Sequence, residues 1–373
     1  MRWSCGAIGL TAALASWLGG PAGGWALEVG VTNLVTDDQT AHPAVIEDTA
    51  LKNPWGVSHS TGSPFWVSDN ATGKSTLYSV DPSTGAPAKV TALEVTIPGD
   101  GSVTGQVSNT VPGSFNNDLF LFASEDGTIS GWRNALGTSA ERFVIASPDN
   151  VYKGVAIGSS SGNAYLYAAN FKTGSVDVFK GNTGAPDLAG RFTDPTLPSG
   201  YAPFNIQALG GSLYVTYAVQ DTNKHDDVAG PGNGIVDVFD FEGNLQRRLV
   251  TGGALNSPWG LALAPSSFGD LAGDLLVGNF GDGKIHIYDP ATGTLVDTLM
   301  VAGQPVAIDG LWGLIAGNGG NAGSLDSIYF TAGPDGETHG LFGVLAVPEP
   351  GSVDLVGFGL VVLARRRSRR ADR

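Results

Sequence analysis

Side chains that carry oxygen atoms recur at two kinds of position in this 373-residue chain. One kind lies near the start of a short apolar segment, and the other lies at the end of the segment that follows. Because hard cations such as Ca²⁺ take six to eight oxygen ligands, convergence of these side chains would create a cation site. Asn and Asp also terminate strands by capping turns, and this second interpretation stays open. The first set is Asn53, Asn150, Asn205, Asn256 and Asp309, and the second is Asp69, Asn70, Glu125, Asn170 and Asn279.

Further candidate ligand-binding residues lie in the acidic segment QDTNKHDDVAGPGNG at 220–234. Its Asp-x-Asn-x-His pattern lacks the spacing and the terminal glutamate of an EF-hand, so it is not a recognised calcium loop. A solvated acidic loop is the alternative interpretation. Together with Asn205, the residues expected to bind a ligand are Asp221, His225, Asp226 and Asp227.

Several catalytic chemistries find no support in the residues. Cys5 is the single cysteine, so the rest of the chain has no thiol for catalysis or metal binding. None of the five histidines stands at metal-ligand spacing from another, which disfavours a zinc site. The pattern GSSSG at 158–162 matches the nucleophile elbow of hydrolases, but that motif needs a strand-to-helix turn and Ser160 is expected between two strands. We therefore assign no catalytic residue.

The segments that carry these side chains repeat along the chain. The clearest copy, at 257–300, reads as four short strands, SPWGLALAP, GDLLVGNF, GKIHIYDP and GTLVDTLM. Related copies recur at intervals of about fifty residues, and 118–132 fills the one double-length gap, which gives six units. Four strands per unit and six units predict an all-β fold, a six-bladed β-propeller over 27–347, with an open β-solenoid as the alternative. The small residue of the first strand aligns at Gly56, Gly154, Asn205, Gly260 and Gly313.

Two consequences follow from propeller geometry. The last unit shows three strands, and LEVGVTNLVTD at 27–37 stands alone before the first, so the N-terminal strand is predicted to complete the last blade and close the ring. Trp55, Trp259 and Trp312 begin first strands and are expected in the core.

The two sets of oxygen-bearing side chains are expected on one face of the propeller. The first two strands of a blade are antiparallel, so the start of the first lies beside the end of the second. The segment at 220–234 joins a second strand to a third and belongs to the same face. We expect this face to carry the function. The residues predicted to bind a metal there are Asn53, Asp69, Asn70, Asn170, Asn256, Asn279 and Asp309.

Charge is distributed unevenly along the chain. Its net charge is −15, and six arginines lie in the last nine positions. Residues 27–347 keep 13 of the 20 basic residues and 32 of the 35 acidic ones, which leaves −19. Such a surface repels nucleic acid and attracts cations.

Both ends of the chain have the composition of targeting segments. Residues 1–26 combine Arg2, an apolar stretch and a small-x-small site, which predicts a secretory signal peptide and export. The C-terminal segment 348–373 follows Val347 and resembles the PEP-CTERM sorting signal of Gram-negative envelope proteins. The motif residues are Val347, Pro348, Glu349 and Pro350, followed by an apolar segment and the arginine cluster of Arg365, Arg366 and Arg367.

The resemblance implies processing near the Pro-Glu-Pro motif by an exosortase-type membrane protease. Membrane contact is then expected only through the C-terminal tag, whose apolar stretch at 351–364 is short for a bilayer core of about 30 Å. The body, with KHDDVAGPGNG followed by VDVFD, resembles an uncharacterised family of PEP-CTERM-tagged propellers. That family brings no assigned activity.

Two functions compete at this point. The favoured one is a non-catalytic protein of the cell envelope or extracellular matrix that binds exopolysaccharide or another surface protein. The alternative is a calcium-dependent hydrolase, because six-bladed enzymes of the gluconolactonase and paraoxonase type hold calcium at the channel mouth. This alternative rests on analogy of fold, and fold does not fix function.

Overall fold

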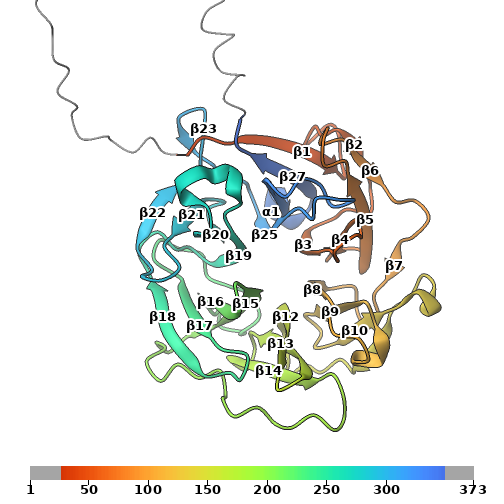
Figure 1. Ribbon diagram of the computed structural model, residues 1–373, viewed down its shortest axis with the longest axis vertical. Coiled ribbons are helices and arrows are strands. Elements are labelled where there is room, and N and C mark those ends of the chain that lie inside the picture. Colours follow the sequence, from red (N-terminus) through yellow and green to blue (C-terminus); the bar gives the residue numbers. More distant parts are fainter. Residues whose placement is uncertain (1–26, 349–373) are drawn as a thin grey trace, which may run out of the picture.

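The computed structural model describes residues 27–348, and their strands form six small sheets arranged as blades around an axis (Figure 1). Within each blade the strands follow one another from the axis outward and pair in antiparallel fashion. This arrangement confirms the predicted all-β, six-bladed propeller. Among the described residues, no helix combines the length and the apolar character that crossing a membrane requires.

The strands of the first three blades are as follows. Blade 1 contains β3 (Pro54–Ser58), β4 (Phe65–Asp69), β5 (Lys74–Val80) and β6 (Pro87–Lys89), and β7 (Val95–Thr96) also pairs with β5. Blade 2 contains β8 (Val103–Ser108), β9 (Phe120–Ser124), β10 (Ile129–Trp132) and β11 (Glu141–Val144). Blade 3 contains β12 (Tyr152–Ser160), β13 (Asn163–Asn170) and β14 (Ser175–Lys180).

The remaining blades complete the ring. Blade 4 contains β15 (Tyr201–Leu209), β16 (Ser212–Val219), β17 (Ile235–Phe239) and β18 (Leu245–Thr251). Blade 5 contains β19 (Pro258–Leu263), β20 (Leu275–Asn279), β21 (Ile285–Tyr288) and β22 (Leu295–Thr298). Blade 6 contains β25 (Leu311–Ala316), β26 (Ser327–Ala332), β27 (Leu341–Ala346), β1 (Gly30–Thr36) and β2 (Ile46–Glu47).

Short elements lie between or beside the blades. The small hairpin of β23 (Met300–Val301) and β24 (Gln304–Pro305) follows blade 5, and α1 (Pro334–Glu337) links β26 to β27. The 3-10 helices are Phe115–Asn117, Asn134–Leu136 and Ser266–Leu271.

Blade 3 departs from the expected four strands, because it has three. The chain after β14 runs through 181–200 without a strand. This segment contains Pro186, Pro195 and Pro198. Proline cannot donate to a strand ladder, which accounts for the missing fourth strand.

The N-terminal strand closes the ring, as the sequence predicts. β1 pairs antiparallel with β27, in a register that sets Gly30 opposite Ala346 and Thr36 opposite Leu341. Val35, in the same strand, is fully buried and belongs to the apolar cluster that joins blades 6 and 1. Both ends of the propeller chain therefore meet in one blade.

The innermost strands approach one another so closely that a side chain has no room at several positions. A Cβ atom on Gly56 would lie 2.7 Å from the carbonyl oxygen of Thr104, and one on Gly105 would lie 2.7 Å from the nitrogen of Val155. On Gly260 it would lie 2.6 Å from the carbonyl oxygen of Trp312. These values are below any ordinary contact, so the aligned small residues mark where one blade packs against the next.

Aromatic side chains fill the axis next to these contacts. Trp55 and Trp312 stack with ring centroids 3.5 Å apart, and Phe280 stacks on the other side of Trp312 at 3.9 Å. Trp259 meets both other indoles edge to face. These residues belong, with Phe171 and Phe204, to one buried cluster, which we call the axial aromatic cluster. The three tryptophans are core residues, as expected.

One buried carboxyl lies inside a blade rather than on a face. Asp237 of β17 is fully buried, and neither carboxylate oxygen has a hydrogen-bond partner among the described residues. Arg248 Nε lies 3.6 Å away while its guanidinium also binds Asp194. Burial dominates and raises the pKa of Asp237 to about 7.

The closing strand can be tested through Val35. We expect Val35→Ala to lower the free energy of unfolding by about 2 kcal/mol, because two buried methyl groups are lost at the closing seam. Val31→Ala is the matched control, since Val31 lies on the same strand but is 36% exposed. Deletion of 27–37 should also expose the edge of β27 and promote association. Denaturant unfolding and sedimentation measure both effects, and a deletion variant that stays monomeric and equally stable would refute the closure.

The pKa of Asp237 predicts a pH-dependent stability. Between about pH 4 and pH 7 the folded carboxyl keeps a proton that the unfolded chain has released, so stability should fall as pH rises, by at most about 1.4 kcal/mol per pH unit. Asp237→Asn cannot ionise and should flatten this decline. Unfolding curves from pH 4 to pH 8 measure the effect. Asp270→Asn, on an exposed turn, is the control, and identical pH profiles for the two variants would contradict the assignment.

Candidate functional site

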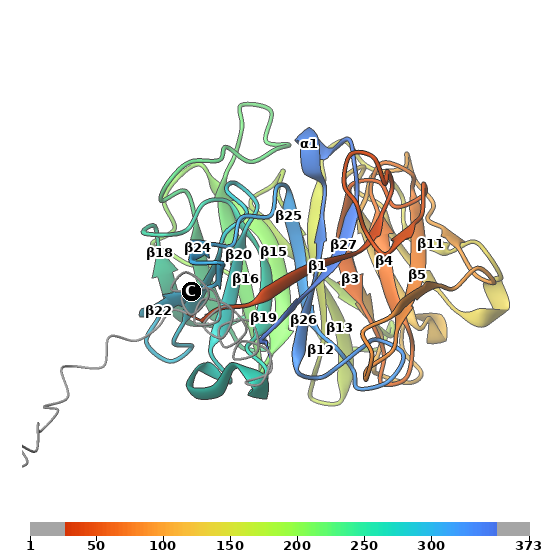
Figure 2. The same ribbon diagram turned by 90° about the horizontal axis from the view of Figure 1, so that it is seen from above.

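The expected face of the propeller does gather polar side chains. The starts of the innermost strands, the ends of the second strands and α1 lie at one end of the axis (Figure 2). The insertion at 220–234 connects β16 to β17 at this same end. We call this end the insertion face.

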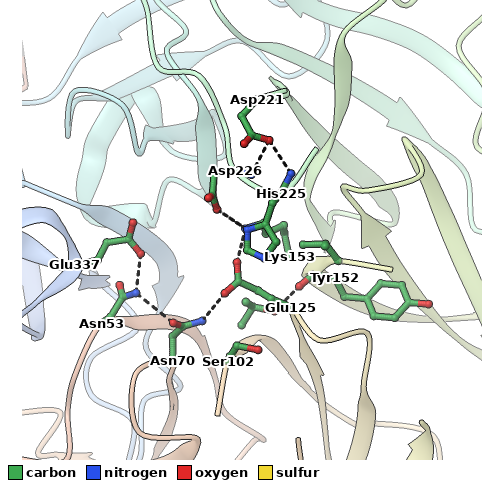
Figure 3. Close-up of polar contacts among 12 residues, drawn as sticks. Asn53, Asn70, Ser102, Glu125, Tyr152, Lys153, Asp221, His225, Asp226 and Glu337 are labelled. Atoms are coloured by element: carbon green, nitrogen blue, oxygen red, sulfur yellow. Dashed lines mark hydrogen bonds and ion pairs between the residues drawn. The ribbon is translucent and has the colours of Figure 1, made fainter. Parts of the chain in front are cut away.

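Lys153 is the centre of a polar network at the channel mouth on this face (Figure 3). Its side chain is 1% exposed, and its ammonium donates to Glu125 Oε1 and to Asp226 Oδ1, the latter at 3.4 Å. The same ammonium lies 5.0 Å from the ring centroid of Trp55 and 5.9 Å from that of Phe171. The axial aromatic cluster thus forms the floor beneath a buried cation, which it stabilises through the ring faces.

Amide side chains extend the network across two more blades. Asn70 Nδ2 donates to Glu125 Oε2 at 3.2 Å, and Asn53 Nδ2 donates to Glu337 Oε2 at 2.6 Å. Asn53 Nδ2 also lies 3.4 Å from Asn70 Oδ1, and Asn53 Oδ1 accepts from Trp312 Nε1 at 3.0 Å. Asn53 therefore joins the polar network to the aromatic floor.

The insertion reaches the network through two adjacent residues. His225 Nδ1 lies 2.9 Å from Asp226 Oδ1, while Asp221 Oδ1 accepts from the backbone N–H of His225 at 2.8 Å. That backbone bond is the main reason why the pKa of Asp221 is lowered. Gly230 N donates to Asn256 Oδ1 at 2.7 Å, and so anchors the far side of the loop to blade 5.

Two carboxyls at the mouth have raised pKa values. Burial is the principal cause for Glu337 and for Asp227, and Lys153 opposes the shift in both. Asp227 Oδ2 is buried and has no partner among the described residues. One ammonium thus faces Glu125, Asp226, Asp227 and Glu337, so the mouth carries an excess of negative charge.

Three ligand atoms at the mouth are close enough together to hold a metal ion. One atom from each of Glu125, His225 and Asp226 lies within 4.8 Å of the others. However, the ammonium of Lys153 binds two of these same carboxylates. A divalent cation there would meet an unscreened positive charge, and the oxygen-rich set that Ca²⁺ requires is incomplete. The residues present therefore fit calcium poorly while Lys153 is charged.

The structure brings some of the predicted site residues together and separates others. Asn53, Asn70, Asp221, His225 and Asp226 belong to the network, and Asp227 lies at its edge. Asp69 is fully buried within blade 1, where burial raises its pKa well above the usual range. Asp309 is exposed and accepts from the backbone N–H of Asp335.

The other separated residues are asparagines that support the backbone. Asn170 Oδ1 accepts from the N–H of Val151, and Asn279 Oδ1 accepts from that of Asn256. Asn256 itself holds the insertion. These three amides serve the capping role that the sequence left open. Asn205 Nδ2 donates to the carbonyl of Trp259 at 2.7 Å, deeper in the channel and between two blades.

Lys153 and Glu337 were missed as site residues by sequence reasoning. Lys153 immediately precedes the aligned Gly154, which was a signal, because none of the other aligned small residues follows a charged residue. Glu337 follows the end of the last second strand by five residues and has the left-handed φ of 69°. The irregular backbone of α1 places it, and no sequence pattern reveals that geometry.

These observations define an exported, six-bladed propeller with a polar channel mouth. Residues 346–370 match the PEP-CTERM protein-sorting motif, which marks a chain for export to the cell envelope or surface. Val347 and Pro348 of that motif end the described chain, whereas the predicted signal peptide at 1–26 and residues Glu349, Pro350, Arg365, Arg366 and Arg367 lie outside the described residues.

The chain belongs to the family of Uncharacterized protein L690 of Acanthamoeba polyphaga mimivirus. The two share 32% identity over 320 residues, which covers 80% of this chain and 81% of the relative. Uncharacterized protein R648 of the same virus is 30% identical over 333 residues, covering 86% and 79%.

Solved structures with a similar fold include two fungal enzymes. The α-L-arabinanase of Penicillium chrysogenum superposes with a TM-score of 0.52 at 11% identity, covering 85% of this chain and 99% of the enzyme. The GH93 α-L-arabinofuranosidase of Fusarium graminearum has a TM-score of 0.53 at 10% identity, covering 86% and 98%. Identities this low show a shared fold and nothing more.

The network predicts a large cost for removing Lys153. Lys153→Met should lower the free energy of unfolding by about 3 kcal/mol, because Glu125 is left in a largely buried position without its cation. The double variant Lys153→Met/Glu125→Gln should recover most of the loss. Lys180→Met is the matched control, since Lys180 pairs with Asp187 on the surface and should cost under about 1 kcal/mol. Chemical denaturation measures all three, and a cost for Lys153→Met as small as the control would contradict the network.

Proposed function

We propose that this chain is a non-catalytic binding propeller of the cell envelope or extracellular matrix, and that its ligand docks on the insertion face. The class of ligand that fits is an exopolysaccharide or another surface protein. An exosortase-type protease is the expected processing partner, because the sorting motif calls for one.

The buried ammonium of Lys153 is the observation that carries this proposal. It lies where the mouth carboxylates converge, and so offsets their charge without a metal ion. The carboxylate, amide and imidazole groups around it can exchange hydrogen bonds with hydroxyls or with cationic groups of a ligand. The excess of acidic side chains favours a neutral or basic ligand over an anionic one.

A calcium-dependent hydrolase is the second candidate function. The three ligand atoms of Glu125, His225 and Asp226 favour it, since they lie within 4.8 Å of one another. It requires Lys153 to move away or to lose its proton. The two candidates therefore differ in how the protein responds to calcium.

Binding to the exopolysaccharide fraction of the producing cells tests the proposal. Asp226→Ala with Asp227→Ala should weaken binding at least about tenfold in a co-sedimentation assay, because two ligand-facing carboxylates are lost. Asp187→Ala with Asp270→Ala is the control, since it makes the same change in net charge at exposed sites away from the mouth. Both double variants should keep their stability within about 1 kcal/mol.

Calorimetry with calcium separates the alternatives. A bound ion would stabilise the fold by about 2.7 kcal/mol at a hundredfold excess over Kd. We expect no such shift. A calcium-dependent shift that disappears in Asp226→Ala/Asp227→Ala would favour the hydrolase, and exopolysaccharide binding that both double variants retain in full would overturn the proposed docking face.

A further inference from the structure

The opposite end of the axis contains a cavity of about 290 Å³. Residues of all six innermost strands line it, including Ser58 and Ser108 at the last positions of β3 and β8. These strand ends lie away from the insertion face. At its inner end the cavity reaches Trp259 and Asn205, so the axial aromatic cluster separates it from the Lys153 network.

The lining of this cavity contains no Asp, Glu, Lys or Arg. Its walls are mostly aliphatic, with side chains such as Val57, Ile157, Ile206 and Leu314. This composition contrasts with residues 27–347 as a whole, whose net charge is −19. A charged ligand would lose its hydration here without gaining a counter-charge, so the cavity selects for uncharged molecules.

Two lining side chains have polar atoms without partners. Gln106 Nε2 donates to the carbonyl oxygens of Gly56, at 2.9 Å, and Trp66, at 2.6 Å. Because carbonyls only accept, these two bonds fix the orientation of the amide and leave Gln106 Oε1 as an acceptor without a donor. Ser58 Oγ is also unpartnered, and both residues are 6% exposed.

Buried polar groups nearly always find a partner, so these two atoms call for one. The partner must supply a hydrogen-bond donor for Gln106 Oε1 and must place carbon atoms against the aliphatic walls. Water satisfies the first requirement alone. The cavity has the volume of roughly ten water molecules at about 30 Å³ each, which is also enough for a compact organic molecule.

We propose that this cavity is a second binding site, separate from the insertion face, for an uncharged hydroxylated small molecule of up to about monosaccharide size. Hydroxyl groups of the ligand donate to Gln106 Oε1 and exchange a hydrogen bond with Ser58 Oγ. Its carbon skeleton packs against the valine, isoleucine and leucine side chains of the innermost strands.

Saturation-transfer NMR on the full chain tests this proposal with meso-erythritol, xylitol and D-glucose as neutral probes and D-glucuronate as the charged counterpart of glucose. Probe concentrations of about 10 mM suit the millimolar Kd expected for so small a ligand. At least one neutral probe should receive saturation from the protein. D-Glucuronate should bind at least about tenfold more weakly than D-glucose, because no cation lines the cavity.

Three variants locate the binding. Ser58→Ala should raise the Kd of the bound probe roughly two- to twelvefold, as expected for one lost hydrogen bond. Ser68→Ala is the matched control, since Ser68 Oγ is likewise buried and unpartnered but does not line the cavity. Ala208→Trp, at the exposed rim, should abolish binding by blocking the mouth, with the fold intact by circular dichroism.

The outcomes separate this site from the insertion face. Asp226→Ala/Asp227→Ala should leave probe binding unchanged, whatever its effect on exopolysaccharide. Absence of saturation transfer to every neutral probe would mean that water alone fills the cavity and would overturn the proposal. Equal Kd values for Ser58→Ala and Ser68→Ala, or full binding by Ala208→Trp, would also overturn it.

Discussion

The close approach of the innermost strands around the axis is the constraint on which the rest of this propeller depends. Gly56, Gly105, Gly260 and Gly313 lie where a Cβ atom would overlap the backbone of the next blade. Blade 4 has Asn205 at the aligned position, and its amide donates across the gap to the carbonyl of Trp259. Gln106, Thr104 and Thr331 make comparable side-chain bonds to the carbonyls of neighbouring blades. Blade spacing is thus set by backbone contact, and buried carbonyls are satisfied by side chains.

This spacing determines what each end of the axis can hold. The residue before the aligned glycine is tryptophan in blades 1, 5 and 6, and the three indoles pack together in the axis. In blade 3 the corresponding residue is Lys153, whose ammonium lies over Trp55. One buried cation among aromatic rings attracts carboxylates from blade 2 and from the insertion of blade 4. A difference of one residue among equivalent positions therefore creates the polar centre of the insertion face.

Repetition made most of the fold predictable. The period, the six units and the closing N-terminal strand all follow from short strands that must bury their faces and leave no open edge. Blade 3 was harder to predict, because its prolines remove a strand that the pattern would supply. The site was less predictable still. Asn170 and Asn279 have the same residue type and strand position as ligand candidates, yet they cap turns. Whether such an amide faces a ligand or the backbone depends on hydrogen-bond partners distant in sequence, such as Val151 for Asn170. Lys153 was missed because its importance depends on Glu125 and Asp226, which contact it only in the folded ring.

The two ends of the axis also differ for a reason that lies in the order of residues along each innermost strand. Each strand begins at the insertion face, passes the aromatic cluster and the close contact with its neighbour, and ends in small or aliphatic residues such as Val57, Ser58, Val107 and Ser108. Side chains of this size cannot fill the axis, which leaves the cavity, whereas the tryptophans at the other end do fill it. The filled end presents charge and the unfilled end presents neutral polar groups. A ligand suited to one end is thus chemically unsuited to the other, and the aromatic cluster keeps the two environments apart.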